Sequence, residues 1–91
     1  MPVTEVTTQA KKILNANSRR ERLVIQNTGT EPALIRVDGD PSDSEYDFVL
    51  AADNTDREGN GGTITIEGIQ GEIRAVTEAN ETTLAVTEVY N

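Results

Sequence analysis

The sequence predicts an all-β fold, in the form of a small antiparallel β-sandwich or barrel of seven to eight short strands. Threonine is abundant, with 12 copies, and most of the Val, Ile and Leu residues are the β-branched types that suit a pleated, half-buried surface. Polar and apolar residues alternate with period two in several segments, and none shows the 3.6-residue period of an amphipathic helix. Turn-forming residues recur about every 8 to 12 positions, which is typical of antiparallel all-β domains.

The first half of the chain contains the strongest predicted pair of strands. Val3 to Gln9 reads as a polar strand, and Ala10 to Leu14 reads as a short one. Leu23 to Gln26 and Ala33 to Val37 are stronger, because the apolar residues of each share one face. A Gly and a Pro lie between these two strands and favour a turn. We therefore predict that the two strands form a hairpin.

The second half of the chain contains four more predicted strands. Tyr46 to Leu50 is the first, and Thr63 to Glu67 alternates clearly. Two Gly residues then flank Ile69–Gln70, which predicts a tight turn or a bulge. Glu72 to Thr77 and Thr82 to Tyr90 follow, joined by a four-residue link. This link predicts a second hairpin.

The length fits a single β domain, residues 1–91, in which residues 1–9 form either an extended N-terminal arm or an edge strand. The expected core is small, because Val, Ile and Leu supply 20 residues and the only aromatic residues are Tyr46, Phe48 and Tyr90. A domain with so few core residues is marginally stable alone. We therefore expect it to oligomerise or to dock on a larger surface.

The composition argues against several classes of function. With 8 basic and 16 acidic residues, the net charge is -8, which disfavours nucleic-acid binding. The chain has no Cys and no His, which excludes disulfides and zinc-thiolate sites and removes the commonest general base. We therefore expect no enzyme activity and no cofactor. No apolar run of about 18 residues is present, so no membrane span is expected.

Two further features of the sequence concern secretion and adaptation to salt. The segment MPVTEVTTQA lacks a basic region followed by an apolar core, so no secretory signal is expected. Lys11 and Lys12 are the only lysines. A high content of Asp and Glu with little Lys fits a protein adapted to high salt, where screening weakens self-repulsion. This favours a salt-loving host as one interpretation.

Two loops are rich in acidic residues. In the segment Asp38 to Glu45, the spacing of Asp38, Asp40 and Asp43 resembles a calcium-binding loop, but the full twelve-residue pattern is missing. We predict a solvated turn, with a weak divalent-ion site, shared between subunits or not, as the alternative. The segment Ala52 to Gly62 lacks the Lys and the Ser or Thr of a phosphate-binding loop. It is predicted to be a flexible connector.

Arg19, Arg20 and Arg22 form the most basic spot of an acidic chain, directly before the strand Leu23 to Gln26. One interpretation is local, with charged side chains protecting an edge strand from aggregation. The other is a docking contact, because Arg is favoured in ion pairs at interfaces. The second interpretation predicts that charge reversal at Arg19 and Arg20 weakens assembly and leaves the fold intact.

Residues 13–37, ILNANSRRERLVIQNTGTEPALIRV, resemble a pattern found in small structural proteins of tailed double-stranded DNA viruses. In that pattern a strand ends in Leu-x-x-Asn, an Arg-containing loop follows, and a second strand ends in Ile-Gln-Asn before a Gly turn. The matching positions here are Leu14, Asn17, Arg19, Arg20, Ile25, Gln26, Asn27 and Gly29. The segment TTLAVTEVY, residues 82–90, also resembles the last strand of such proteins.

The resemblance implies a virion protein of the capsid decoration or cement type. Such proteins are often small β-rich trimers that bind where capsid proteins meet, on the capsid exterior. The implied partners are the major capsid protein or other virion subunits, with Arg19, Arg20 and Arg22 as the contact. The alternative is a recognition module of a tail, neck or head fibre, whose loops Asp38 to Glu45 and Ala52 to Gly62 bind a host glycan or protein.

Overall fold

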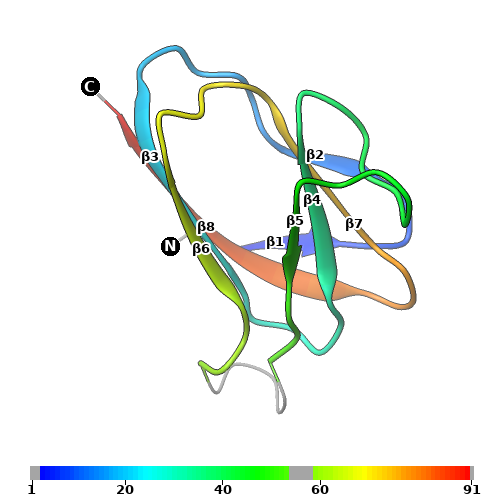
Figure 1. The fold of residues 1–91 in the computed structure, drawn as a ribbon. Helices are drawn as coiled ribbons and strands as arrows, with labels where there is room; N and C mark the ends of the chain where they lie inside the picture. The colour runs from blue at the N-terminus through cyan, green and yellow to red at the C-terminus, as the bar shows by residue number, and fades with distance from the viewer. Residues whose placement is uncertain (1–2, 54–58, 91) are drawn as a thin grey trace.

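Eight strands make up the regular structure of residues 3–53 and 59–90, the part of the chain that the computed structural model describes (Figure 1). No helix occurs in this part. The strands are β1 (Val3–Val6), β2 (Lys11–Leu14), β3 (Arg20–Asn27), β4 (Ala33–Val37), β5 (Phe48–Leu50), β6 (Thr63–Glu67), β7 (Ile73–Thr77) and β8 (Thr82–Tyr90).

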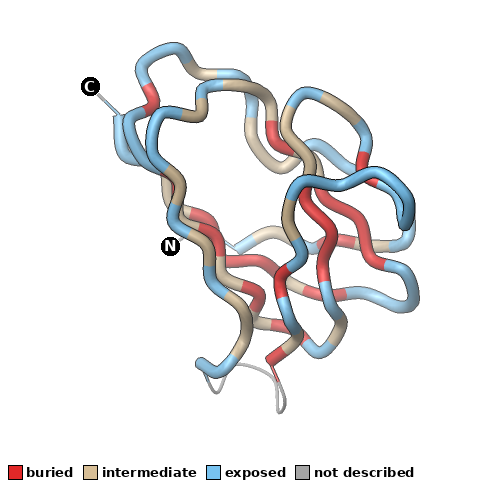
Figure 2. Tube along the Cα trace, viewed as in Figure 1, coloured by how far each residue is buried: buried red, intermediate tan, exposed pale blue. Residues whose placement is uncertain are grey.

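The strands form two antiparallel sheets of four. Sheet A has the order β1-β8-β3-β6, and sheet B has the order β2-β7-β4-β5. The two sheets face each other, and the main cluster of buried apolar residues lies on the surfaces that they share (Figure 2). The all-β prediction is therefore confirmed, and the architecture is that of a small β-sandwich.

The core consists of alternate residues from the inner faces of both sheets. Leu23 and Ile25 of β3 are fully buried, and Ile35 and Ile73 of sheet B are at most 1% exposed. The faces predicted from alternation are thus correct for β3 and β4. Burying a side chain of this size contributes about 1.5–3 kcal/mol. The complete buried cluster is Val6, Leu23, Ile25, Ala33, Ile35, Leu50, Ile73, Ala75, Leu84 and Val86.

Both predicted hairpins are wrong. β3 lies in sheet A and β4 in sheet B, and β7 and β8 are divided in the same way. Among strands that follow one another in the chain, only β4 and β5 are paired. Alternation shows which face of a strand is apolar. Two successive strands can both point that face into the core, however, either from the same sheet or from opposite sheets. The short links therefore cross between sheets, which pack about 10 Å apart.

The N-terminal segment and β3 differ from prediction in their extents. β1 ends at Val6 and pairs with β8, from Val3 opposite Ala85 to Val6 opposite Thr82, so it is an edge strand of its own domain. β3 begins at Arg20, three residues before the predicted start at Leu23. Charged residues such as Glu21 lower β propensity, yet they are accommodated because they face solvent.

Candidate interaction surfaces

Arg20 is buried at the start of β3, where four hydrogen bonds surround its guanidinium. Its Nε donates to the Glu88 carboxylate at 2.9 Å, and its side chain is fully shielded from solvent. The other two nitrogens donate to the carbonyls of Asn15 at 2.7 Å, Ile69 at 3.1 Å and Gly71 at 2.9 Å. One side chain thereby holds the β2–β3 and β6–β7 connections against β8. We call this arrangement the Arg20 clamp.

The prediction that Arg20 contacts a partner is therefore wrong, because its guanidinium is buried and bonded within the chain. A register shift of β3 against β8, between Arg20 and Arg22, turns Arg20 toward the interior. Arg22 faces outward, 53% exposed and 3.9 Å from Glu67, and Arg19 is exposed. A role for Arg19 and Arg22 in docking stays a prediction.

A second clamp lies at the other end of β3, around the fully buried Asn27. Its Nδ2 donates to the carbonyls of Glu31 at 2.7 Å and Leu50 at 3.1 Å. Its Oδ1 accepts from the Gly29 N–H at 3.0 Å and the Thr82 hydroxyl at 2.7 Å. All four hydrogen-bonding positions of the amide are thus used. This Asn27 clamp joins the β3–β4 crossing to β5 and β8.

Three of the residues that carry the resemblance, Asn17, Arg20 and Asn27, have structural roles in this chain. Asn17 accepts the Arg19 N–H on its Oδ1 at 3.0 Å, and its own N–H donates to the Gln70 carbonyl at 2.8 Å. Together with Arg20 it shapes the loop before β3, while Asn27 shapes the turn after β3. The signal for Asn27 was present in the sequence, because it continues the inward alternation of Leu23 and Ile25.

Part of the predicted flexible connector is anchored. Asp53 is 1% exposed, its N–H donates to the Gly29 carbonyl at 2.8 Å, and its carboxylate accepts the Gly59 N–H at 2.8 Å. Gly61 packs so tightly on the Asn27 carbonyl that a Cβ at this position would overlap it. Residues 54–58 lie outside the described part of the chain. The described ends of this loop are therefore fixed to the turn after β3.

The acidic segment from Asp38 to Asp47 uses most of its carboxylates within the fold. Asp38, with a positive φ of 57°, accepts the Glu72 N–H at 3.0 Å, and Asp47 accepts the Val37 N–H at 2.8 Å. Within residues 3–53 and 59–90, no group of three acidic side chains is placed to hold a metal ion. The structure thus gives the candidate ligands Asp38, Asp40 and Asp43 no common centre.

The same segment covers the outer face of sheet B. Asp40 pairs with Arg74 at 2.9 Å, and Glu45 pairs with Arg36 at 2.8 Å. Between these pairs, the buried Pro41 lines a pocket together with Leu34 and Val76. Both of these face outward from sheet B, yet they are only 4% and 7% exposed. The segment therefore forms a lid with a small apolar layer beneath it.

Sheet A has a different outer face, which we call the open face. The register of its strands places seven uncharged outward positions side by side: Val3, Val24, Gln26, Thr63, Thr65, Ala85 and Thr87. The charged outward residues, Glu5, Arg22 and Glu67, lie at the two ends of this area. The exposed positions of this face are Val3, at 60%, Thr63 and Thr65, whereas Ala85 near its centre is only 7% exposed. A chain with net charge -8 thus presents one sheet face with an uncharged centre.

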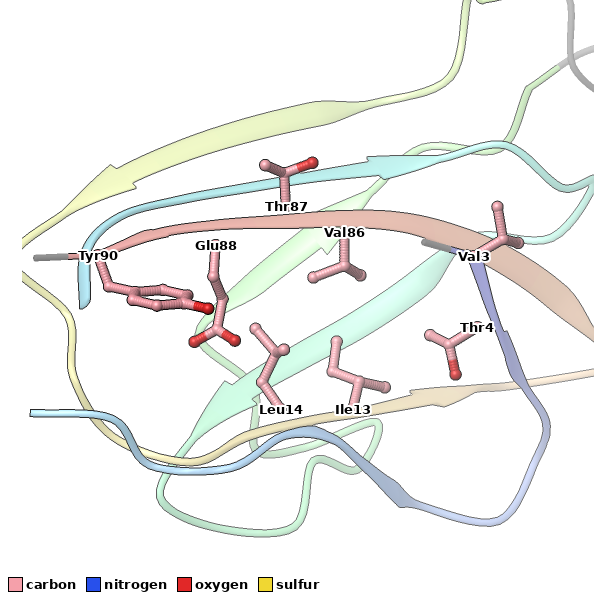
Figure 3. Close-up of a pocket in the computed structure, with 8 residues that line it drawn as sticks. All are labelled: Val3, Thr4, Ile13, Leu14, Val86, Thr87, Glu88 and Tyr90. Carbon is pink, nitrogen blue, oxygen red and sulfur yellow. The ribbon is translucent and has the colours of Figure 1, made fainter. Parts of the chain in front are cut away.

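A groove of about 310 Å³ opens between β2 and β8 (Figure 3). Ile13 and Leu14 line it from β2, and Val86 and Glu88 point toward them from β8. Tyr90 lies at one end of the groove and is 58% exposed. The groove is therefore mainly apolar, with one carboxylate and one phenol near its end.

Glu5 and Glu81 bring two carboxyl groups together where β1 meets the start of β8. A hydrogen bond with Glu5, followed by the negative charge of Glu5 and a smaller effect of burial, raises the pKa of Glu81. The folded state therefore holds this proton more tightly than the unfolded chain. Below the ordinary pKa of Glu, the protonated Glu81 contributes its full stabilisation to the folded state. This stabilisation is lost as the pH rises from that ordinary pKa through the raised pKa of the folded protein.

Replacing Glu81 by Gln should accordingly stabilise the fold near neutral pH, because it removes the repulsion and keeps a donor toward Glu5. The gain over wild type should shrink as the pH falls and Glu81 becomes protonated. Urea unfolding of both proteins between about pH 4 and pH 7 measures this difference. A difference that stays constant over this range would contradict the coupling of the two groups.

Comparison of the chain with protein-family models, curated proteins and solved structures found no match. Within residues 3–53 and 59–90, no helix is long and apolar enough to cross a membrane.

Proposed function

We propose that this chain is a structural virion protein that decorates and stabilises the capsid of a tailed virus. It binds the major capsid protein or neighbouring virion subunits on the capsid exterior, as a homo-oligomer. The observation that carries this proposal is the open face of sheet A, because an uncharged sheet face on an acidic domain suits docking on another protein. Charged residues are depleted at the centres of protein interfaces.

The proposed mechanism is mechanical. Each copy buries part of its open face across a seam between capsid proteins, and so binds the assembled shell better than the separate subunits. A ligand that binds only one state stabilises that state by RT ln(1 + [L]/Kd). The acidic remainder of the surface keeps the particle soluble. The Arg20 and Asn27 clamps serve by holding sheet A in shape.

Quantitative mass spectrometry of purified particles of the source virus tests the function. Hundreds of copies per particle are expected for a decoration protein. A few to a few dozen copies would indicate a tail, neck or vertex component, and absence from the particle would refute a virion role.

Binding of the recombinant protein to particles lacking it tests the surface. Replacing Val3 by Lys puts a charge on the open face, at its β1 side, and should weaken binding about tenfold or more. Val49 is the matched control, because it is 51% exposed on the outer face of sheet B. Replacing Val49 by Lys should leave binding unchanged. Equal effects of the two substitutions would contradict docking through the open face.

A second candidate function is that of a recognition module on a tail, neck or head fibre. The groove between β2 and β8 favours it, because about 310 Å³ lies at the small end of the range for ligand sites. Titration with a panel of sugars, followed by NMR, should then shift the signals of Tyr90 and Val86. Unchanged signals across the panel would exclude these sugars as ligands of the groove.

A further inference from the structure

The sandwich has four edge strands, β1 and β6 in sheet A and β2 and β5 in sheet B. An edge strand carries backbone N–H and C=O groups without a partner on one side, and it can pair with another chain. Natural proteins prevent this with Lys or Pro, with bulges or with very short strands. The four edges of this domain differ in how far they are protected.

Three of the edges are protected. β2 carries Lys11 and Lys12, and its register shifts between Lys12 and Leu14. β1 has four residues, and the carbonyl of its Glu5 accepts a hydrogen bond from the Lys11 Nζ at 3.0 Å. β5 has only three residues, Phe48–Leu50. None of these three edges offers a long regular strand for pairing.

β6 has none of these protections. Its five residues, Thr-Ile-Thr-Ile-Glu, contain no Lys and no Pro, and they pair with β3 without a register shift. No other strand of the described chain pairs with its second edge. Ile64 and Ile66 face inward but are only half-buried, whereas their neighbours on β3, Ile25 and Leu23, are fully buried. The apolar core is therefore incomplete along this edge.

The sequence of β6 is complementary to itself in antiparallel pairing. In a register centred on Thr65, this residue lies opposite Thr65 of the partner subunit. Ile64 lies opposite Ile66 of the partner subunit, on the inner face, and Thr63 lies opposite Glu67 of the partner subunit. No like charges are opposed, which matters for two chains that each carry a net charge of -8.

We infer that two copies of this chain form a two-fold dimer through antiparallel pairing of their β6 edges. The two A sheets then join into one continuous sheet, and the Ile64 and Ile66 side chains of both copies cover one another. The pairing also brings the two open faces together into one larger surface. The inference does not depend on the proposed function, and its two-fold symmetry differs from the trimer implied by the viral resemblance.

Light scattering and native mass spectrometry of the full chain, from micromolar to millimolar concentration, test the dimer. Wild type should reach twice the 9.9 kDa chain mass. Replacing Thr65 by Lys opposes two like charges at the two-fold axis and should weaken the dimer about fivefold or more. Replacing Thr63 by Lys places the new charge opposite Glu67 of the partner subunit and should leave the dimer as strong or strengthen it.

Both Thr residues are exposed on the same face of the same strand, so the two Lys variants are matched controls for folding. A wild-type mass of one chain or of three chains at every concentration would overturn the inference. So would equal weakening by the two substitutions, because it would exclude this register.

Cross-linking provides a second test, because the chain has no native Cys. In the dimer, Thr65→Cys would bring two thiols opposite each other at a Cα separation of about 4.5–5.5 Å, which a disulfide spans. This variant should form a covalent dimer under mild oxidation. Thr63→Cys should not, because its counterpart lies further along the strand. Equal cross-linking of the two variants would contradict the pairing.

Discussion

Replacing Arg20 by Met should lower the free energy of unfolding by about 3–5 kcal/mol. Glu88 then loses its cation, and the carbonyls of Asn15, Ile69 and Gly71 lose their donors. Met fills a similar volume, so the loss reports on the unpaired polar groups more than on a cavity. Since small domains have about 5–15 kcal/mol in total, the variant should be close to unfolding at ambient temperature.

Urea denaturation of the Arg20 and Arg22 variants measures this effect. Arg22→Met is the matched control, since its side chain is 53% exposed and its contact with Glu67 is long, at 3.9 Å. Its effect should stay within about 0.5 kcal/mol. Arg20→Lys should fall between the two, because Lys keeps the charge but lacks the planar fork of donors. If Arg20→Met were as stable as Arg22→Met, the clamp would have no part in stability.

Replacing Asn27 by Asp should lower the free energy of unfolding by about 2–4 kcal/mol at neutral pH. The substitution keeps the shape of the side chain but exchanges the amide donor for an oxygen. That oxygen would face the carbonyls of Glu31 and Leu50, which lie 2.7 and 3.1 Å from the present nitrogen. The Oδ1 contacts to Gly29 and Thr82 can persist, so the effect isolates the donor half of the clamp.

The control for this substitution is Asn15→Asp, which makes the same change of charge at an exposed side chain. It should alter stability by no more than about 0.5 kcal/mol. Lowering the pH should restore part of the loss in Asn27→Asp alone, because a protonated carboxyl can donate a hydrogen bond again. Equal stability of the two variants at neutral pH would show that the donors of Asn27 are dispensable.

The Arg20 clamp explains one residue of the basic cluster that lies directly before a strong strand, and the Asn27 clamp closes the other end of that strand. β3 pairs with β8 on one side and with β6 on the other, and Arg20 and Asn27 mark its two ends. Because consecutive strands mostly lie in different sheets, the connections at each end of β3 must cross or flank the core. Buried side chains at these positions donate hydrogen bonds to backbone carbonyls, most of which lie outside the strands and so outside the hydrogen-bond pattern of either sheet.

Composition and alternation were enough to predict the all-β class and the apolar faces of β3 and β4. Alternation is a local property, because successive side chains of a strand point to opposite sides. Leu23 and Ile25 were therefore correctly predicted to lie in the core, as were Ala33 and Ile35. The same alternation, extended by one step, places Asn27 inside as well.

The pairing of the strands and the role of Arg20 depend on contacts between segments that are far apart in the sequence. An apolar face is buried in the core whether the next strand joins the same sheet or the opposite one. Alternation therefore could not predict that the links after β3 and β7 cross between the sheets. The register shift between Arg20 and Arg22 depends on the fit of β3 against β8. That fit turns Arg20 inward toward carbonyls far away in the sequence, and no local pattern carries information about such partners.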